Sequence, residues 1–175
     1  GDGIDDIYQG TTLVLSDNGK FYDKGDTHLP MEELFNKCMV GQFNSGCFSH
    51  DADTGDADGD GDMDIFTAIS SSHVDNYPMG WAMLINDGTG NFTANKKFPT
   101  QTANVFATAA TIGDFDNDGH GDVAVGWFKT EQAAANGFAE TYENSAGAVF
   151  WNDGNNDWRN IDWTELPDTY YGTNG

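Results

Sequence analysis

The residues most able to do chemistry in this sequence are aspartates gathered in short, glycine-rich stretches. Residues 113–122 read GDFDNDGHGD and hold four aspartates and three glycines in ten positions. Two carboxylates about 4 Å apart repel by roughly 4 kcal/mol at an effective dielectric constant near 20. A compact loop of this kind must therefore be neutralised by a cation, extended into water, or left unfolded.

Three acidic stretches of this type align with one another. They read GDGIDDIY (1–8), DADGDGDMDIF (56–66) and DFDNDGHGDVAV (114–125). Their last aspartates are Asp6, Asp64 and Asp122, so both intervals are 58 residues. This agreement indicates an internal repeat.

A second pattern also occurs once in each unit, at residues 13–21, 83–92 and 149–158. Each copy is an apolar or aromatic run, then an Asn/Asp/Gly turn, then an aromatic residue. Asn-Gly and Asp-Gly tolerate the positive φ angles of tight hairpins, so each copy predicts two antiparallel strands joined by a short turn. Residues 30–40 are compatible with one short helix, and no long helical periodicity is present.

In the third unit, strands are expected at 104–113, 122–128, 147–152 and 158–166. Four antiparallel strands recurring at this period are typical of a β-propeller blade. We therefore predict an all-β fold: a β-propeller segment of about three four-stranded antiparallel blades, with the acidic loop between the first and second strands. The approximate units are 1–47, 48–103 and 104–175, and the first lacks its opening strand and carries an insertion at 24–47.

The positions of the acids within each loop favour a metal site over a solvated acidic turn. Acids at loop positions 1, 3 and 5 turn toward one point, glycine at 6 allows a sharp bend, position 7 offers its carbonyl oxygen, and the acid at 9 closes the shell, as in an EF-hand loop. An all-oxygen anionic shell suits Ca²⁺ better than Mg²⁺ or zinc. The two complete sets are Asp56, Asp58, Asp60, Asp62 and Asp64, and Asp114, Asp116, Asp118, His120 and Asp122; a partial third set is Asp2, Ile4 and Asp6.

Two neighbouring features leave alternatives open. His120 could be misread as a zinc ligand, but its loop position assigns it a backbone role with the side chain facing solvent. Asp51 and Asp53 lie just before the second loop, where they either support the metal ligands or are surface acids.

The pattern D-x-D-x-D-G-x-x-D followed by a short apolar strand resembles the FG-GAP and VCBS repeat families, which form the propeller of integrin α subunits and of many secreted or surface proteins. The resemblance covers the three units, and the VCBS-like branch fits better because a Phe-Gly…Gly-Ala-Pro signature is missing. It implies calcium in the loop between the first two strands of each blade. The long insertions argue against a specific integrin-type ligand surface.

Composition narrows the class of partner. The chain has 175 residues, 13% aromatics and a formal net charge of −22, which argues against nucleic acid and anionic membranes as partners. No apolar run approaches the roughly 20 residues of a membrane helix. The opening lacks an initiator Met and a signal peptide, so we expect a fragment or processed piece whose remaining blades come from the same parent chain or a neighbouring chain.

The resemblance implies a secreted or cell-surface location, and two features are consistent with it. Cys38 and Cys47 are expected to form a disulfide there, the alternative being two free thiols in a reducing compartment. Asn91-Phe92-Thr93 is an N-glycosylation acceptor pattern on a hairpin turn.

No sequence motif for catalysis is present, so we do not expect an enzyme. An acid pair, Asp162 and Glu165, lies near Trp158 and Trp163 in the sequence and resembles the acids of a sugar-cleaving site. A far commoner arrangement is that such aromatics pack between blades and the acids face water. The leading function is a non-catalytic calcium-binding module for protein binding or adhesion. The alternatives are a structural part of a larger surface assembly, filament or complex, and a carbohydrate-binding propeller using exposed aromatics, namely Trp81, Trp127, Trp151, Trp158 and Trp163.

Overall fold

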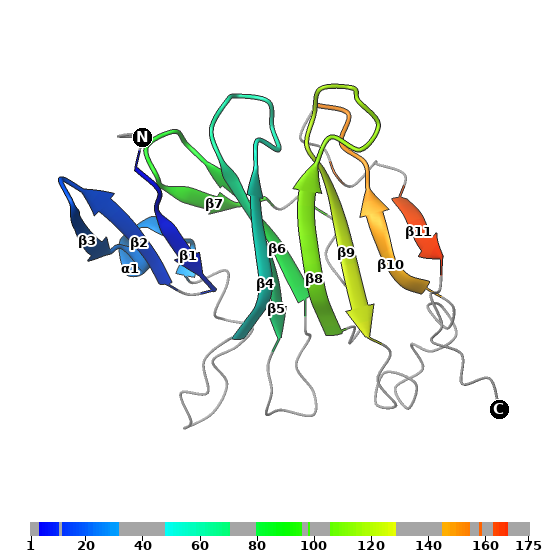
Figure 1. Ribbon diagram of the computed structural model, residues 1–175, viewed down its shortest axis with the longest axis horizontal. Coiled ribbons are helices and arrows are strands. Elements are labelled where there is room, and N and C mark those ends of the chain that lie inside the picture. The colour runs from blue at the N-terminus through cyan, green and yellow to red at the C-terminus, as the bar shows by residue number, and fades with distance from the viewer. Residues whose placement is uncertain are drawn as a thin grey trace.

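The computed structural model describes residues 4–10, 12–31, 48–70, 80–95, 98, 106–128, 145–154, 158 and 163–167. Over these residues the chain forms three separate antiparallel sheets (Figure 1). Each sheet uses consecutive strands in the order of the sequence or its reverse, so neighbouring strands are joined by direct connections. No sheet closes on itself among the described strands.

Sheet 1 has three strands, and sheets 2 and 3 have four each. Sheet 1 comprises β1 (Ile7–Gln9), β2 (Thr12–Asp17) and β3 (Lys20–Asp23), followed by the short helix α1 (Gly25–His28). Sheet 2 comprises β4 (Phe48–Gly55), β5 (Asp64–Ser70), β6 (Gly80–Asn86) and β7 (Phe92–Ala94). Sheet 3 comprises β8 (Phe106–Gly113), β9 (Asp122–Phe128), β10 (Ser145–Phe150) and β11 (Trp163–Pro167).

The turn between β2 and β3 shows why these sequences form hairpins. Asn18 and Gly19 have φ angles of 51° and 75°, and Asp17 pairs with Lys20 directly across the turn. Both central residues are thus left-handed, which matches the twist of the flanking strands and which Asn-Gly tolerates. The turn residues fix the register of the sheet locally.

The three sheets stack in chain order, and a hydrophobic core fills each of the two spaces between them (Figure 1). The core between sheets 1 and 2 is made of Leu13, Leu29, Ile65, Leu84 and Phe92. The larger core between sheets 2 and 3 is made of Ala57, Phe66, Ala68, Met83, Phe98, Ala107, Val123, Val125, Trp127, Ala148, Phe150 and Trp158. Alternation along each strand therefore sends one face of sheet 2 to each neighbour.

Aromatic rings concentrate in the second core. The ring of Trp81 stacks on Trp127 with centroids 6.1 Å apart, and Phe98 lies 4.9 Å from Trp158. Trp127 and Trp158 are 6% and 0% exposed. For Trp127 and Trp158 the expectation of an exposed ring for sugar binding is therefore wrong, because both lie in the core between sheets 2 and 3.

The all-β class and the three antiparallel sheets are confirmed, whereas the propeller ring and the unit boundaries stay predictions. Residues 32–47, which include most of the expected helix 30–40 together with Cys38 and Cys47, lie outside the described residues. The insertion at 129–144 and the acid Asp162 lie outside them as well. Among the described helices, none is long and apolar enough to cross a membrane.

Candidate metal centre

Two acidic loops connect the first and second strands of sheets 2 and 3, on the same side of the molecule (Figure 1). We call residues 56–64 acidic loop 2 and residues 114–122 acidic loop 3. The glycine at position 6 of each loop, Gly61 or Gly119, has a φ angle of 93° or 95°. A residue with a Cβ would be strained there, so the predicted sharp bend at glycine is present in both loops.

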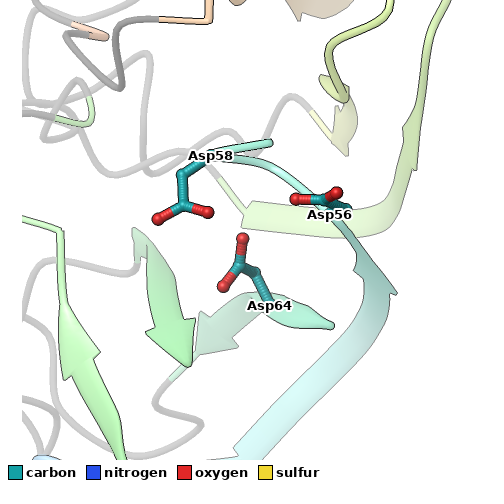
Figure 2. A group of neighbouring side chains, drawn as sticks. All are labelled: Asp56, Asp58 and Asp64. Atoms are coloured by element: carbon teal, nitrogen blue, oxygen red, sulfur yellow. The ribbon is translucent and has the colours of Figure 1, made fainter. Parts of the chain in front are cut away.

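Each loop brings three carboxylates together. In acidic loop 2 these belong to Asp56, Asp58 and Asp64, and one oxygen from each lies within 4.8 Å of the others. Figure 2 shows the carboxylates of Asp58 and Asp64 facing each other, with Asp56 beside them. In acidic loop 3 the corresponding group is Asp114, Asp116 and Asp122. The acids at positions 1, 3 and 9 thus converge in both copies.

The acid at position 1 holds the loop backbone in shape. Asp56 accepts hydrogen bonds from the backbone N–H groups of Gly59 and Gly61 at 2.8 and 3.0 Å. Asp114 accepts bonds from the N–H groups of Asp118 and Gly119, both at 3.0 Å, so the bond from the position 6 glycine is the one that both loops share. Folding of the loop therefore orients this carboxylate before any ligand arrives.

The acid at position 9 connects the loop to the hairpin of the same sheet. Asp64 accepts hydrogen bonds from the N–H groups of Ala57 and Asn86, both at 2.8 Å. Asp122 accepts them from Phe115 and Asn152 at 2.9 and 2.8 Å. Both aspartates are fully buried. These buried carboxylates are thus held by two backbone donors each.

Burial without a counter-charge disfavours the ionised carboxylates. Burial raises the pKa of Asp64 to about 6, against the opposing effect of its two backbone hydrogen bonds. Burial also raises the pKa of Asp122, and the charges of Asp116 and Asp118 add to the rise. The pKa of Asp58 is raised by burial and by the neighbouring charges of Asp60 and Asp56. A cation between these groups would remove this penalty.

The arrangement also contains an unsatisfied oxygen. Among the described residues, Oδ1 of Asp58 is buried and has no hydrogen-bond partner. A buried, unpaired carboxylate oxygen is costly unless it is paired or coordinates a metal. The converging atoms are all carboxylate oxygens, which are hard ligands of the kind that Ca²⁺ takes in proteins.

The predicted residues at positions 5 and 7 lie outside the two groups of converging carboxylates. Asp60 accepts a hydrogen bond from the N–H of Asp62, and Asp118 accepts one from the N–H of His120, both at 2.9 Å. The side chain of Asp62 lies against Gly88 of the hairpin.

The expectation that the side chain of His120 faces solvent is wrong. It is half-buried, and its ring lies against Gly59 of acidic loop 2 and Gly154 of the sheet 3 hairpin. A Cβ at position 154 would overlap the imidazole ring. His120 therefore packs between the two loops, because glycines on either side leave room for the ring.

Of the partial first set, the structure describes Ile4 and Asp6. Asp2 lies outside the described residues, and Ile4 is 49% exposed. Asp6 accepts a 2.7 Å hydrogen bond from the N–H of Ser16, which is the counterpart of the bonds from Asn86 and Asn152 to the position 9 acids. No group of three converging carboxylates includes Asp6 among the described residues.

Asp51 and Asp53 both accept hydrogen bonds from the neighbouring sheet, so neither is a free surface acid, while a role in supporting the metal ligands stays a prediction. Asp51 accepts a 2.9 Å hydrogen bond from the N–H of Ala110, and Asp53 accepts bonds from the hydroxyl of Thr111 and the N–H of Ile112 at 2.8 and 2.9 Å. They therefore attach β4 to the backbone of β8. Burial alone would raise the pKa of Asp53, but these bonds lower it overall.

Sequence reasoning missed the structural role of two asparagines. The amide nitrogen of Asn86 donates to the carbonyl of Met63 at 3.1 Å, and that of Asn152 donates to the carbonyl of Gly121 at 3.0 Å. The Asn152 side chain also donates to the carbonyl of Ala57, across the sheet boundary. The two asparagines occupy matched positions in the sequence, in IND and WND just before each turn. This pattern could have pointed to a shared role, but it was interpreted only as a sign of a hairpin.

The match to a known family falls on this same region. Residues 56–125 match the model of the FG-GAP-like repeat, a span that includes both acidic loops. No match to the chain was found among curated proteins or among solved structures. This match over residues 56–125 agrees with the resemblance to FG-GAP repeats drawn from the acidic loops.

Proposed function

We propose that this chain is a non-catalytic, calcium-binding repeat module that serves protein binding or adhesion in a secreted or surface protein. The observation that carries the calcium site is the convergence of three carboxylates in each loop, with the buried, unpaired oxygen of Asp58 in one of them. In each site, positions 1, 3 and 9 would hold the ion. Position 5, through Asp60 or Asp118, and the backbone carbonyl of Asp62 or His120 would complete the shell.

The bound ion would supply positive charge that cross-links the two ends of each loop. The protein's own backbone groups position the carboxylates that would hold the ion. The position 1 carboxylate is oriented by two backbone N–H groups, and the position 9 carboxylate is fixed to the hairpin. The role is structural, since the loop joins the first two strands of a sheet and its charge must be balanced for that sheet to be stable.

In a secreted or surface protein we expect weak calcium sites, since extracellular modules bind calcium with Kd values on the order of 0.1–1 mM. FG-GAP repeats typically occur in proteins at these locations. Asn91 is exposed on its hairpin turn, where a glycan could be attached. The proposed disulfide between Cys38 and Cys47 remains a prediction that intact mass before and after reduction and alkylation would check.

Calcium titration of the chelator-treated protein by isothermal calorimetry tests the proposal. We expect two sites, and Mg²⁺ at the same concentration should bind much more weakly. Asp118→Ala should lower the affinity of one site at least tenfold, because it removes one anionic ligand. The matched control, Asp51→Ala, should leave the affinity unchanged, because Asp51 bonds to β8. No heat of calcium binding, or equal losses in both variants, would contradict the proposed site.

A further inference from the structure

Acidic loops 2 and 3 are in contact at three places. A Cβ at Gly121 would lie 2.7 Å from the carbonyl oxygen of Asp56, so the backbones of the two loops approach each other closely. The ring of His120 lies against Gly59, whose N–H donates to the carboxylate of Asp56. The third contact is made by the side chain of Asn152, which reaches acidic loop 2 from the sheet 3 hairpin.

A line of hydrogen bonds runs from one position 9 aspartate to the other. In acidic loop 2, the N–H of Ala57 donates to Asp64 at 2.8 Å. The carbonyl of Ala57 accepts a hydrogen bond from the side-chain amide of Asn152. The backbone N–H of Asn152 donates in turn to Asp122 of acidic loop 3 at 2.8 Å. Two residues, Ala57 and Asn152, therefore connect the two carboxylates that would close the calcium sites.

Every residue of this line is shielded from water. Ala57, Asp64 and Asp122 are all 0% exposed, and Asn152 is 2% exposed. A buried polar group that loses its partner bears the full cost of desolvation, so the members of a buried network keep their bonds and adjust together. A change in the position of the Asp122 carboxylate is therefore transmitted through Asn152 to the backbone that holds Asp64.

We propose that acidic loops 2 and 3 bind calcium with positive cooperativity, because the hydrogen-bond line through Asn152 ties their position 9 carboxylates together. This inference rests on the proposed calcium sites and adds a coupling between them. With calcium bound in one loop, the position 9 carboxylate of that loop is held in place, and the line orders the carboxylate of the other. The ordering entropy is then lost mainly at the first binding step, and the second step is more favourable.

Charge acts in the opposite direction. Binding at one loop reduces the negative charge that attracts a cation to the other, and two bound cations repel each other. Acidic loop 2 contains five aspartates and acidic loop 3 contains four, so each loop keeps a negative charge after it binds one Ca²⁺. Salt screens the repulsion between exposed charges much more than it weakens buried interactions. The cooperativity should therefore increase with salt concentration.

Site-resolved calcium titration of the isotope-labelled chain by NMR tests the coupling. The amides of Gly61 and Gly119 report on their own loops, because each donates to the position 1 carboxylate of its loop. Asp116→Ala removes a converging carboxylate and disables acidic loop 3, and Asp58→Ala disables acidic loop 2 in the same way. The affinity of the intact loop should fall about fivefold or more, by the same factor in both variants, because coupling between two binding sites is reciprocal.

Charge alone predicts the opposite result for these variants. Asp116→Ala leaves an empty acidic loop 3 with three aspartates, which is more negative than the same loop with four aspartates and one Ca²⁺. Electrostatics would therefore strengthen calcium binding at acidic loop 2. An unchanged or higher affinity of the intact loop would overturn the coupling. A wild-type chain in which neither loop responds to calcium would instead contradict the proposed calcium sites themselves.

Repeating the titration in two further backgrounds tests the part played by Asn152. With Asn152→Ala present, Asp116→Ala should no longer lower the affinity of acidic loop 2. The matched control is Asn86→Ala, which removes a bond to the Met63 carbonyl within sheet 2 and should retain the full loss. An undiminished loss with Asn152→Ala would overturn the role of the hydrogen-bond line. The single-loop variants keep Asn152, so they measure the coupling even if Asn152→Ala does not fold.

Discussion

Asp6 and Asp64 hold the same position of the repeat but have different surroundings. Asp6 is exposed and accepts a backbone hydrogen bond from Ser16, whereas Asp64 is fully buried and accepts two, from Ala57 and Asn86. In sheet 2 the complete acidic loop and the strand before it enclose the carboxylate. The same residue at the same spacing thus becomes a buried structural anchor only where the first strand and the loop are both present.

The largest effect expected is that of removing calcium. A site held at 100 times its Kd stabilises the native state by about 2.7 kcal/mol, so chelation at two such sites should lower the melting temperature on the order of 10 °C. Differential scanning calorimetry with and without excess chelator measures this. Asp6→Ala should leave the shift unchanged, because Asp6 belongs to no converging group. An identical melting curve in chelator would show that the loops are stable without the ion.

The next effect compares the two aspartates directly. Asp64→Ala should cost about 3 kcal/mol or more, because two buried backbone donors lose a charged acceptor, each bond being worth about 1.5–3 kcal/mol. Asp6→Ala should cost about 1 kcal/mol or less, since its bond is exposed to water. Urea unfolding of both variants measures the difference. Similar losses would mean that burial of the position 9 acid is unimportant.

A third comparison separates contacts within one sheet from contacts between sheets. Asn152→Ala should cost about 1–3 kcal/mol, because it leaves a part-buried carbonyl beside acidic loop 3 without its donor, and Asn86→Ala should cost about 1 kcal/mol or less, because its bond to the Met63 carbonyl is exposed to water. Only Asn152 also reaches Ala57 of acidic loop 2. Asn152→Ala should therefore weaken calcium binding at both loops, whereas Asn86→Ala should weaken it at loop 2 alone. Calorimetric titration distinguishes one altered site from two.

The smallest effect concerns the attachment of β4 to β8. Because the pKa of Asp53 is lowered by folding, its stabilising contribution is present above the ordinary aspartate pKa of 3.8 and is lost as pH falls through the lower folded value. Asp53→Asn should cost about 1 kcal/mol at neutral pH, and the difference from wild type should vanish in acid.

Thermal melting as a function of pH measures this contribution of Asp53. Thr111→Val, which removes one donor to the same carboxylate, should show a smaller loss of the same sign. A pH-independent difference between Asp53→Asn and wild type would mean that the charge of Asp53 contributes nothing.

Local chemistry determined much of this protein. The aspartate spacing, with glycine at position 6, predicted the two acidic loops, because backbone geometry over nine residues decides which carboxylates can meet. Turn residues such as Asn18 and Gly19 predicted the hairpins, since only a few residue types tolerate positive φ. The repeat of 58 residues and the resemblance to FG-GAP repeats followed from the same local patterns.

Only the tertiary structure decided which side chains act between sheets. The sequence leaves open whether Asp51 and Asp53 support the metal ligands or are surface acids. Their bonds to the backbone of β8 exist only because β8 lies beside β4. The imidazole of His120 is taken out of solvent by glycines on two other segments, and Asn152 reaches a carbonyl 95 residues away in the sequence. These contacts depend on how the sheets stack, and stacking is set by burial of whole apolar faces, which a local pattern does not encode.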